Sequence, residues 1–193
     1  MANADAPFGL RPVRYLSGAP YNGAANLYYV PSTDNTAIYI GGMVKLAGSA
    51  DADGIASVTG NVSTGNPVVG VVVGVKPVTA TSTTYREASV EQYVFVADDP
   101  NLVFAIQEDS VGGALAAANV GNTADITGFT GGSTSTGRSS LEIDSSTATA
   151  SGDGTEDVLI VGLVQEPDNA IGTNANWLVR LNNHQFVDGV AGA

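Results

Sequence analysis

Residues 68–75 read VVGVVVGV and residues 158–164 read VLIVGLV, and these two runs indicate the fold class of the 193-residue chain. Both are rich in β-branched valine and apolar throughout, whereas a strand with one face in water alternates apolar and polar residues. They predict strands that are buried on both faces. The glycines at 70, 74 and 162 allow bends or β-bulges within these strands.

Similar short runs, bounded by Gly, Asn, Asp or Pro, recur along the chain. They predict further strands at residues 38–40, 43–47, 55–59, 90–97, 102–107, 141–144 and 177–181. One short helix is expected over VGGALAAANV, which follows a capping residue at Ser110 and ends before Gly121. The pattern indicates a mainly all-β protein, a compact β-barrel or a jelly-roll-like sandwich with one short helix.

The composition divides the chain into an arm and a body. Residues 1–36 contain four prolines, which favour an extended path over a surface, anchored by Phe8, Leu10, Tyr15 and Leu16. A flexible tail is the alternative. Residues 37–193 form a single β-rich domain in this interpretation. Within it, residues 128–157 are rich in Ser, Thr and Gly, and they predict a long hairpin or loop excursion.

The side chains used in most catalysis are scarce. The chain has one histidine, no cysteine and seven Lys plus Arg against nineteen Asp plus Glu, a net charge of −12. The arm carries a net charge of +1 over residues 1–33, so −13 falls on the rest. Phosphate binding needs clustered cations, so direct nucleic-acid binding is not expected. A surface this poor in charge suits burial against another protein.

Targeting signals are not visible in the sequence. No stretch approaches the ~20 apolar residues that a membrane-spanning helix needs. The first residues, MANADAPFGLRPVRY, lack the basic start and apolar block of a secretory signal. We therefore expect a protein without a membrane span, made in a cytoplasm.

The motifs that could carry chemistry have simpler interpretations as turns. Asp51-Ala-Asp53-Gly54 begins like a calcium loop, but Val62 stands where such a loop needs its twelfth-position Glu. Asp98-Asp99-Pro100-Asn101 joins two expected strands and has good turn chemistry. The acidic group Asp153, Glu156 and Asp157 is interpreted as a solvated loop. His184 has no nucleophile motif beside it and is interpreted as a structural or interface histidine.

Four segments together resemble the capsid decoration, or cement, proteins of tailed bacteriophages. They are APFGLRPVRYLSGAPYNG with LYYVPSTD, then GNPVVGVVVGV, then QYVFVADDPNLVFAIQED, and finally VGLVQEPDNAIGTNANWLVRLNNHQF. The segments cover about half of the chain. The resemblance implies a β-rich, non-enzymatic protein that binds the major capsid protein on the outer surface of the virion. There it would form a trimer, with a dimer as the alternative, and brace the shell where capsid subunits meet.

Under this hypothesis the large side chains of the peripheral segments contact the capsid protein or sister subunits. The predicted contacts are Phe8, Leu10, Arg11, Arg14, Tyr15, Trp177, Arg180, His184 and Phe186. No catalytic residue, cofactor or metal site is predicted. Two alternatives stay open: a tail or fibre module that recognises a host surface through residues 128–157, and a polysaccharide-cleaving enzyme using Glu91, Glu108 or Asp109.

Overall fold

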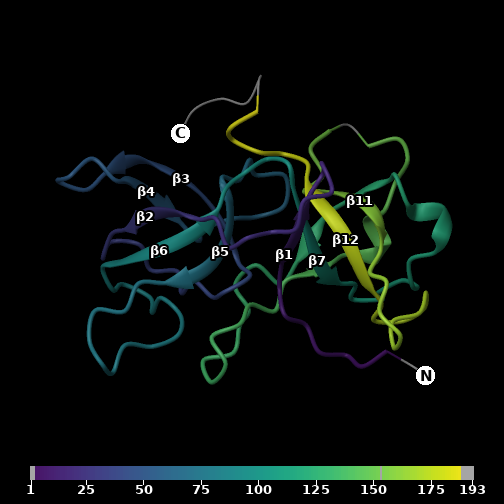
Figure 1. Cartoon of the computed structure of the whole chain (residues 1–193), viewed down its shortest axis with the longest axis horizontal. Coiled ribbons are helices and arrows are strands. Elements are labelled where there is room, and N and C mark those ends of the chain that lie inside the picture. Colours follow the sequence, from purple (N-terminus) through teal and green to yellow (C-terminus); the bar gives the residue numbers. More distant parts are fainter. Residues whose placement is uncertain (1–2, 153, 188–193) are drawn as a thin grey trace.

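The computed structural model describes residues 3–152 and 154–187 and shows a protein built almost entirely from β-strands. A closed five-stranded barrel lies beside a five-stranded sheet (Figure 1). The barrel order is β2 (Asn26–Val30), β4 (Ala56–Thr59), β3 (Met43–Ala50), β5 (Gly70–Val75) and β6 (Gln92–Ala97). The sheet order is β1 (Arg11–Tyr15), β7 (Leu102–Gln107), β12 (Asn176–Leu181), β11 (Val158–Leu163) and β8 (Thr123–Ala124). The mainly all-β prediction is confirmed.

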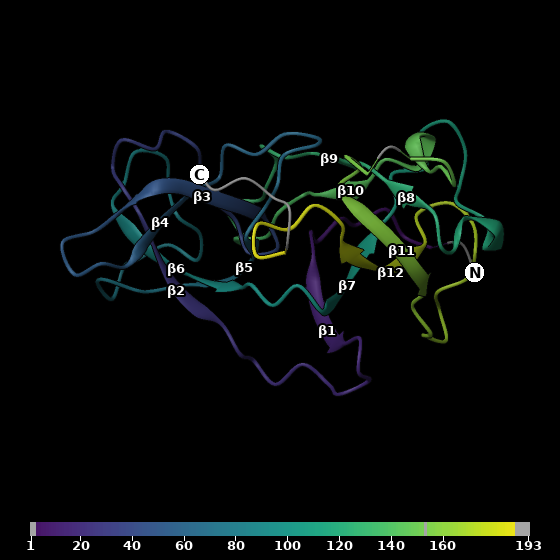
Figure 2. The ribbon, with the colours of Figure 1, turned by 90° about the horizontal axis from the view of Figure 1, so that it is seen from above.

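Short elements complete the chain. Strands β9 (Ile126–Thr127) and β10 (Glu142–Ile143) form a two-stranded ladder, and two 3-10 turns, η1 (Ala117–Asn119) and η2 (Ser145–Thr147), lie nearby. Seen from above, the barrel and the sheet remain side by side, with β1 next to β7 (Figure 2). Among the described residues, no helix has the length and apolarity to cross a membrane.

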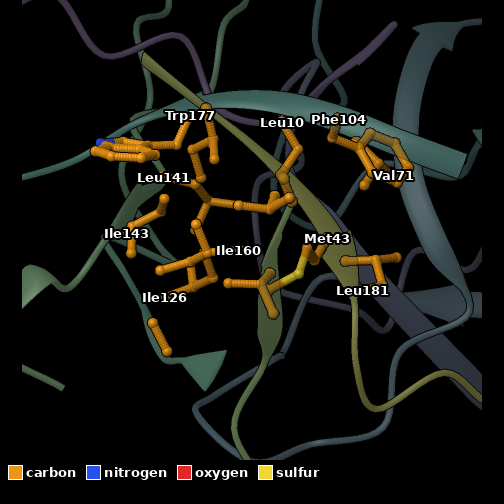
Figure 3. Packing of buried hydrophobic residues seen from close by; sticks show 14 of the residues in the cluster. Leu10, Met43, Val71, Phe104, Ile126, Leu141, Ile143, Ile160, Trp177 and Leu181 are labelled. Atoms are coloured by element: carbon orange, nitrogen blue, oxygen red, sulfur yellow. The ribbon is translucent and has the colours of Figure 1, made fainter. Parts of the chain in front are cut away.

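Strand β5 belongs to two cores at once. Val72 points into the barrel, where it packs with Val44 and other buried valines. Its neighbour Val71 points the other way, into a larger core with Phe104 and Trp177 (Figure 3). Successive side chains of a strand face opposite sides, so an apolar strand can serve as a barrel stave and as the wall of a second core. The prediction of burial on both faces is confirmed for residues 68–72, while residues 73–75 are half-buried.

The second valine-rich run behaves differently. In β11, Val158 and Ile160 are buried in the larger core, but Leu159 and Val161 between them are partly exposed. The prediction that this strand is buried on both faces was therefore wrong, because the side chains of its outer face stay in partial contact with solvent. The glycine prediction is confirmed for Gly74 and Gly162, since the β-ladders shift register between Val72 and Gly74 and between Ile160 and Gly162, while the pairing of Gly70 with Val44 is regular.

The expected helix does not form. Residues 111–120 contain only the 3-10 turn η1, and the prediction of a short helix was wrong. Gly112 and Gly113 adopt positive φ values of 84° and 124°, which interrupt a right-handed helix before the alanines begin. Residues 38–40 likewise form isolated bridges, Ile38 with Arg86 and Ile40 with Arg138, instead of the expected strand.

Residues 1–36 are more deeply integrated than a surface arm. Within them β1 pairs with β7 along the sheet edge, and β2 is a barrel stave that pairs with β6 and β4. Leu10 lies in the larger core, and Tyr28 and Val30 lie in the barrel core. The segment at 128–157 is anchored in a similar way, because Leu141 and Ile143 pack in the larger core.

A buried arginine, Arg86, joins two loops of the barrel through hydrogen bonds. The guanidinium of Arg86 donates hydrogen bonds of 2.7–2.8 Å to the carbonyl oxygens of Val90, Thr36, Pro31 and Asp34. Its Nη1 also lies 3.7 Å from the Asp34 carboxylate. Burial lowers the pKa of Arg86, and the nearby Asp34 opposes that shift. These bonds satisfy loop carbonyls that would otherwise be buried without partners.

The two glycines of β5 make a matched pair for testing the double-core strand. A Cβ at Gly70 would collide with the carbonyl oxygen of Ala97 and approach the Cα of Asp98 to 2.9 Å, so β5 and β6 would separate. A Cβ at Gly74 would meet only the Phe95 side chain, at an ordinary 3.6 Å. We predict that Gly70→Ala lowers the free energy of unfolding by about 2 kcal/mol or more, as overpacking does.

Gly74→Ala is the control and should change that free energy by less than about 1 kcal/mol. Chemical denaturation followed by Trp177 fluorescence measures both variants. Equal effects of the two substitutions would contradict the packing described for β5.

Candidate partner-binding surface

Three of the predicted contact residues lie inside the chain's own core. The side chains of Leu10 and Trp177 are buried in the larger core, and Trp177 is 0% exposed. His184 is also buried, with its Nδ1 accepting a hydrogen bond from the backbone N–H of Phe186. Burial lowers the pKa of this imidazole. These three residues are not on the surface, so the available contacts are the remaining six.

The remaining predicted contacts lie at two places. Phe186 is exposed beside His184, and the half-buried Arg180 donates from Nε to the carbonyl oxygen of Pro100 at 3.1 Å. The others, Phe8, Arg11, Arg14 and Tyr15, follow one another along the N-terminal segment and β1. Arg14 donates to the carbonyl oxygen of Tyr15, and the Tyr15 ring packs against the larger core. Phe8 and Arg11 are left as the prominent surface groups.

Two glycines fix how the N-terminal segment crosses the body. Gly9 and Gly41 have φ values of 73° and 88°, and Leu10 N–H donates to the Gly41 carbonyl oxygen at 2.9 Å. A Cβ on Gly9 would lie 2.7 Å from that oxygen and 2.9 Å from the Cβ of Ser139. Only glycine permits this approach. Leu10 is thereby buried, while Phe8 is half-buried.

A short hairpin brings an arginine to the same place. Residues 132–139 turn back on themselves, with Ser133 and Gly137 joined by a 2.7 Å hydrogen bond. The returning strand docks on Ile40, whose N–H donates to Gly137 and whose carbonyl oxygen accepts from Ser139. Gly137 and Ser139 are buried by this contact, and Arg138 between them is exposed.

These elements form what we call the N-terminal groove, defined by Phe8, Arg11, Tyr21, Val73 and Arg138. All five line one cavity of about 300 Å³. A neighbouring cavity of about 480 Å³ continues along Pro7 and the 132–139 hairpin and shares Phe8 and Arg138. The walls of the first cavity are largely aromatic and aliphatic, those of the second add serine and threonine, and the two arginines supply the charge.

Two cations of the groove have little compensation from the rest of the described chain. Arg11 is 59% exposed, lies 5.2 Å from the centre of the Phe8 ring, and has an ion pair with Glu166 at 3.7 Å. The Arg138 guanidinium has no ion pair or hydrogen bond with any residue in 3–152 or 154–187. By contrast, Arg86 is fully bonded and Lys45 donates to Asn66 at 2.7 Å.

Exposed apolar side chains continue from the groove along β1. Val13 and Leu16 are both exposed, Leu16 by 45%. We call Phe8, Arg11, Val13 and Leu16 the N-terminal strip. The free edge of β1 is already occupied, because Tyr15 N–H donates to Ala19 and Tyr21 N–H donates to Val13. A partner would therefore meet the strip through side chains and not by adding a strand.

The acidic motifs serve the protein's own loops. Asp98 accepts hydrogen bonds from Tyr28 and Asn26 on β2, and Asp99 accepts from the N–H of Asn101 in the turn before β7. Burial, together with the bond to Asp98, raises the pKa of Tyr28. This arrangement is the turn that the sequence predicts.

The Asp51–Gly54 motif is also a turn. The Asp51 carboxylate accepts from the N–H groups of Asp53 and Ile55 and from the Tyr93 hydroxyl at 2.7 Å. These bonds, the Tyr93 bond first, lower the pKa of Asp51, and the same bond raises the pKa of Tyr93 to about 12. Within the described ranges, no three His, Asp or Glu side chains are placed to hold a metal ion.

One member of the predicted solvated acidic loop is buried instead. The carboxylate of Asp157 accepts hydrogen bonds of 2.9 Å from the N–H groups of Gly65 and Ile126. Burial raises its pKa to about 6, although these two bonds act in the opposite direction. Asp157 therefore ties the β4–β5 loop to β9, and its interpretation as a solvated group was wrong. Asp153 lies outside the described residues.

The three carboxylates that a polysaccharide-cleaving enzyme would use have different partners in the structure. Glu91 accepts from the Tyr29 hydroxyl on the barrel. Glu108 is fully buried and accepts from Leu115 N–H at 2.6 Å, and burial raises its pKa. Asp109 accepts from Val111 and Ser145. None of the three lines the cavities described above.

Sequence reasoning missed Glu142, whose pKa is shifted strongly in the folded chain. Burial raises its pKa to about 7, and the charges of Asp5 and Asp109 add to the shift. It also missed Arg138 and Tyr21 in the groove. The one available signal was that Arg138 is among only seven basic residues, set in a Ser/Thr/Gly-rich segment.

Comparison with protein-family models, with curated proteins and with solved structures finds no match for this chain.

The raised pKa of Glu142 predicts a pH dependence of stability. The folded state holds this proton up to about pH 7, whereas the unfolded chain releases it near 4.5, so stability is lost as pH rises between these values. Glu142→Gln removes that loss. At about pH 8 the variant should be more stable than the parent by about 2 kcal/mol, and near pH 4 the two should be equal.

Denaturation curves across this pH range provide the measurement. The exposed Glu87→Gln is the control and should track the parent at every pH. A parent and a Glu142→Gln variant that differ by the same amount at both ends of the range would refute the assigned pKa shift.

Proposed function

We propose that the protein is a structural virion component, a decoration or cement protein that binds the outside of a phage capsid. The observation that carries the proposal is the N-terminal strip, where the exposed Arg11, Val13 and Leu16 and the half-buried Phe8 follow one another along a strand edge that is already paired. Exposed apolar side chains in a row are a feature of surfaces that bind other proteins. The resemblance of the sequence to capsid decoration proteins supports the same assignment.

The way the strip is held also suits a bracing role. β1 pairs with β7 along almost its full length, and Leu10 beside it is anchored in the larger core. Force applied to the strip would pass into the central sheet and not into a loose tail. Many modest contacts repeated by symmetry can hold a shell together even when each one is weak.

The acidic character of the rest of the surface fits an exterior position. With a net charge of −12, the chain repels polyanions, so it would bind protein in preference to packaged DNA. The partner in this proposal is the major capsid protein, met where its subunits join. Contacts with sister copies, in a trimer or a dimer, would involve the second exposed site around Phe186.

A tail or fibre module is the second candidate. The observation that favours it is the 132–139 hairpin, whose residues 133–136 are exposed and could contact a host surface. Copy number separates the two candidates. A cement protein is present in hundreds of copies per particle, and a fibre or tail part in a handful.

Capsid binding by point variants tests the proposal. Removal of the whole N-terminal segment is unsuitable, because it would delete β1 and the core residue Leu10. We predict that Leu16→Ser weakens binding to capsids stripped of the protein by about tenfold, since an apolar contact worth about 1.4 kcal/mol is lost. Cosedimentation with such capsids measures the occupancy.

Val78→Ser is the matched control, because Val78 is 72% exposed but lies on the barrel, away from the strip. Its binding should equal that of the parent, and both variants should keep the parent's melting temperature within a few degrees. Parent protein that fails to bind capsids at all would overturn the proposed function.

A further inference from the structure

The N-terminal groove has a feature that a general contact surface does not require. Its two exposed guanidiniums, Arg11 and Arg138, line one cavity together with the rings of Phe8 and Tyr21. Arginines whose charges are poorly compensated repel each other when they share a site. Such a pair indicates a place where an anion from outside supplies the missing charge.

The two arginines are poorly compensated within their own chain. The ion pair of Arg11 with Glu166 is 3.7 Å long and joins two well-exposed side chains, a kind of pair that contributes little. The guanidinium of Arg138 has no ion pair or hydrogen bond with any described residue. The chain as a whole carries a net charge of −12, so two arginines that line one cavity differ from its overall charge.

We propose that the N-terminal groove binds a carboxylate-bearing, apolar segment of a partner protein. The carboxylate of an Asp or Glu would lie between Arg11 and Arg138, since guanidiniums recognise carboxylates through paired N–H donors. A neighbouring aliphatic or aromatic side chain would fill the cavity against Phe8, Tyr21 and Val73. The neighbouring cavity of about 480 Å³ along Pro7 and the hairpin would take the continuation of the segment.

The groove fits a peptide better than a nucleic acid. A strand of phosphates needs a row of cations, and two arginines on a chain of net charge −12 do not provide one. The cavity walls between the arginines are apolar, which suits a carboxylate flanked by an apolar side chain. The glycine contact between Gly9 and Gly41 and the docking of Ser139 on Ile40 hold the two walls in place before any ligand arrives.

This inference deepens the proposed function, because the partner in that proposal is the capsid protein, but it can be tested without capsids. A displayed library of random dodecapeptides is selected on the full chain. We expect the selected peptides to share an acidic residue next to an apolar one. Their affinity, measured by fluorescence anisotropy, should fall about tenfold or more in Arg138→Gln and in Arg11→Gln, the loss of one charge-assisted contact.

Lys76→Gln is the matched control, since it removes one exposed positive charge from the barrel outside the groove. It should leave peptide affinity unchanged. Selected peptides without a carboxylate, or peptides that bind Arg138→Gln as well as the parent, would overturn the proposal. So would tight binding of oligo-dT that depends on Arg138, which would assign the groove to nucleic acid.

Three further outcomes distinguish this inference from self-association of the chain and from the proposed function. If sedimentation shows that the parent forms an oligomer and that Arg138→Gln dissociates it, the groove binds a second copy of this chain, which would overturn the inference. If peptides bind in the groove but the protein does not bind capsids, the inference is upheld and the proposed function is contradicted. If no peptide is selected and capsid binding survives both arginine substitutions, the inference about the groove is overturned and the proposed function is upheld.

Discussion

The apolar strand β5 is the constraint around which the protein is organised. Its side chains alternate between the barrel interior, where Val72 packs, and the larger core, where Val71 packs with Phe104 (Figure 3). Two cores that share one wall gain or lose their packing together, so the barrel and the sheet form one folded body. The shared wall also explains why Gly70 must lie against the backbone of Ala97, with no room for a side chain.

The surface features follow from this arrangement. The N-terminal segment begins beside the sheet, where Asn3 donates to Ala170 and Thr173, and it meets the barrel side where Gly9 lies on Gly41. Its Leu10 then enters the larger core. That anchoring leaves Phe8, Arg11 and Leu16 at the surface on a rigid support. The hairpin of residues 132–139 docks on Ile40 at the same crossing and adds Arg138. The strip and the groove therefore exist because two distant parts of the chain pack on the shared wall.

Much of the fold could be predicted from the sequence, because buried β-branched runs are a local signal. Strand β7 was predicted with its observed bounds, and the ends of most other strands shift by only a few residues. Strands β1 and β2 were missed, since both lie in the proline-punctuated segment 1–36 and pair with strands distant in the sequence. The candidate site was harder, because nothing local to Arg138 places it beside Arg11, and burial of Trp177 and His184 is decided by tertiary packing.

A reconstruction of an assembled phage particle at side-chain resolution would examine the proposed role most completely. The account predicts density for this protein on the outer face of the shell, with Phe8, Arg11, Val13 and Leu16 facing capsid protein and with a capsid carboxylate between Arg11 and Arg138. A particle in which the chain occupies only the tail, or in which the strip faces open solvent while another surface contacts the shell, would contradict it.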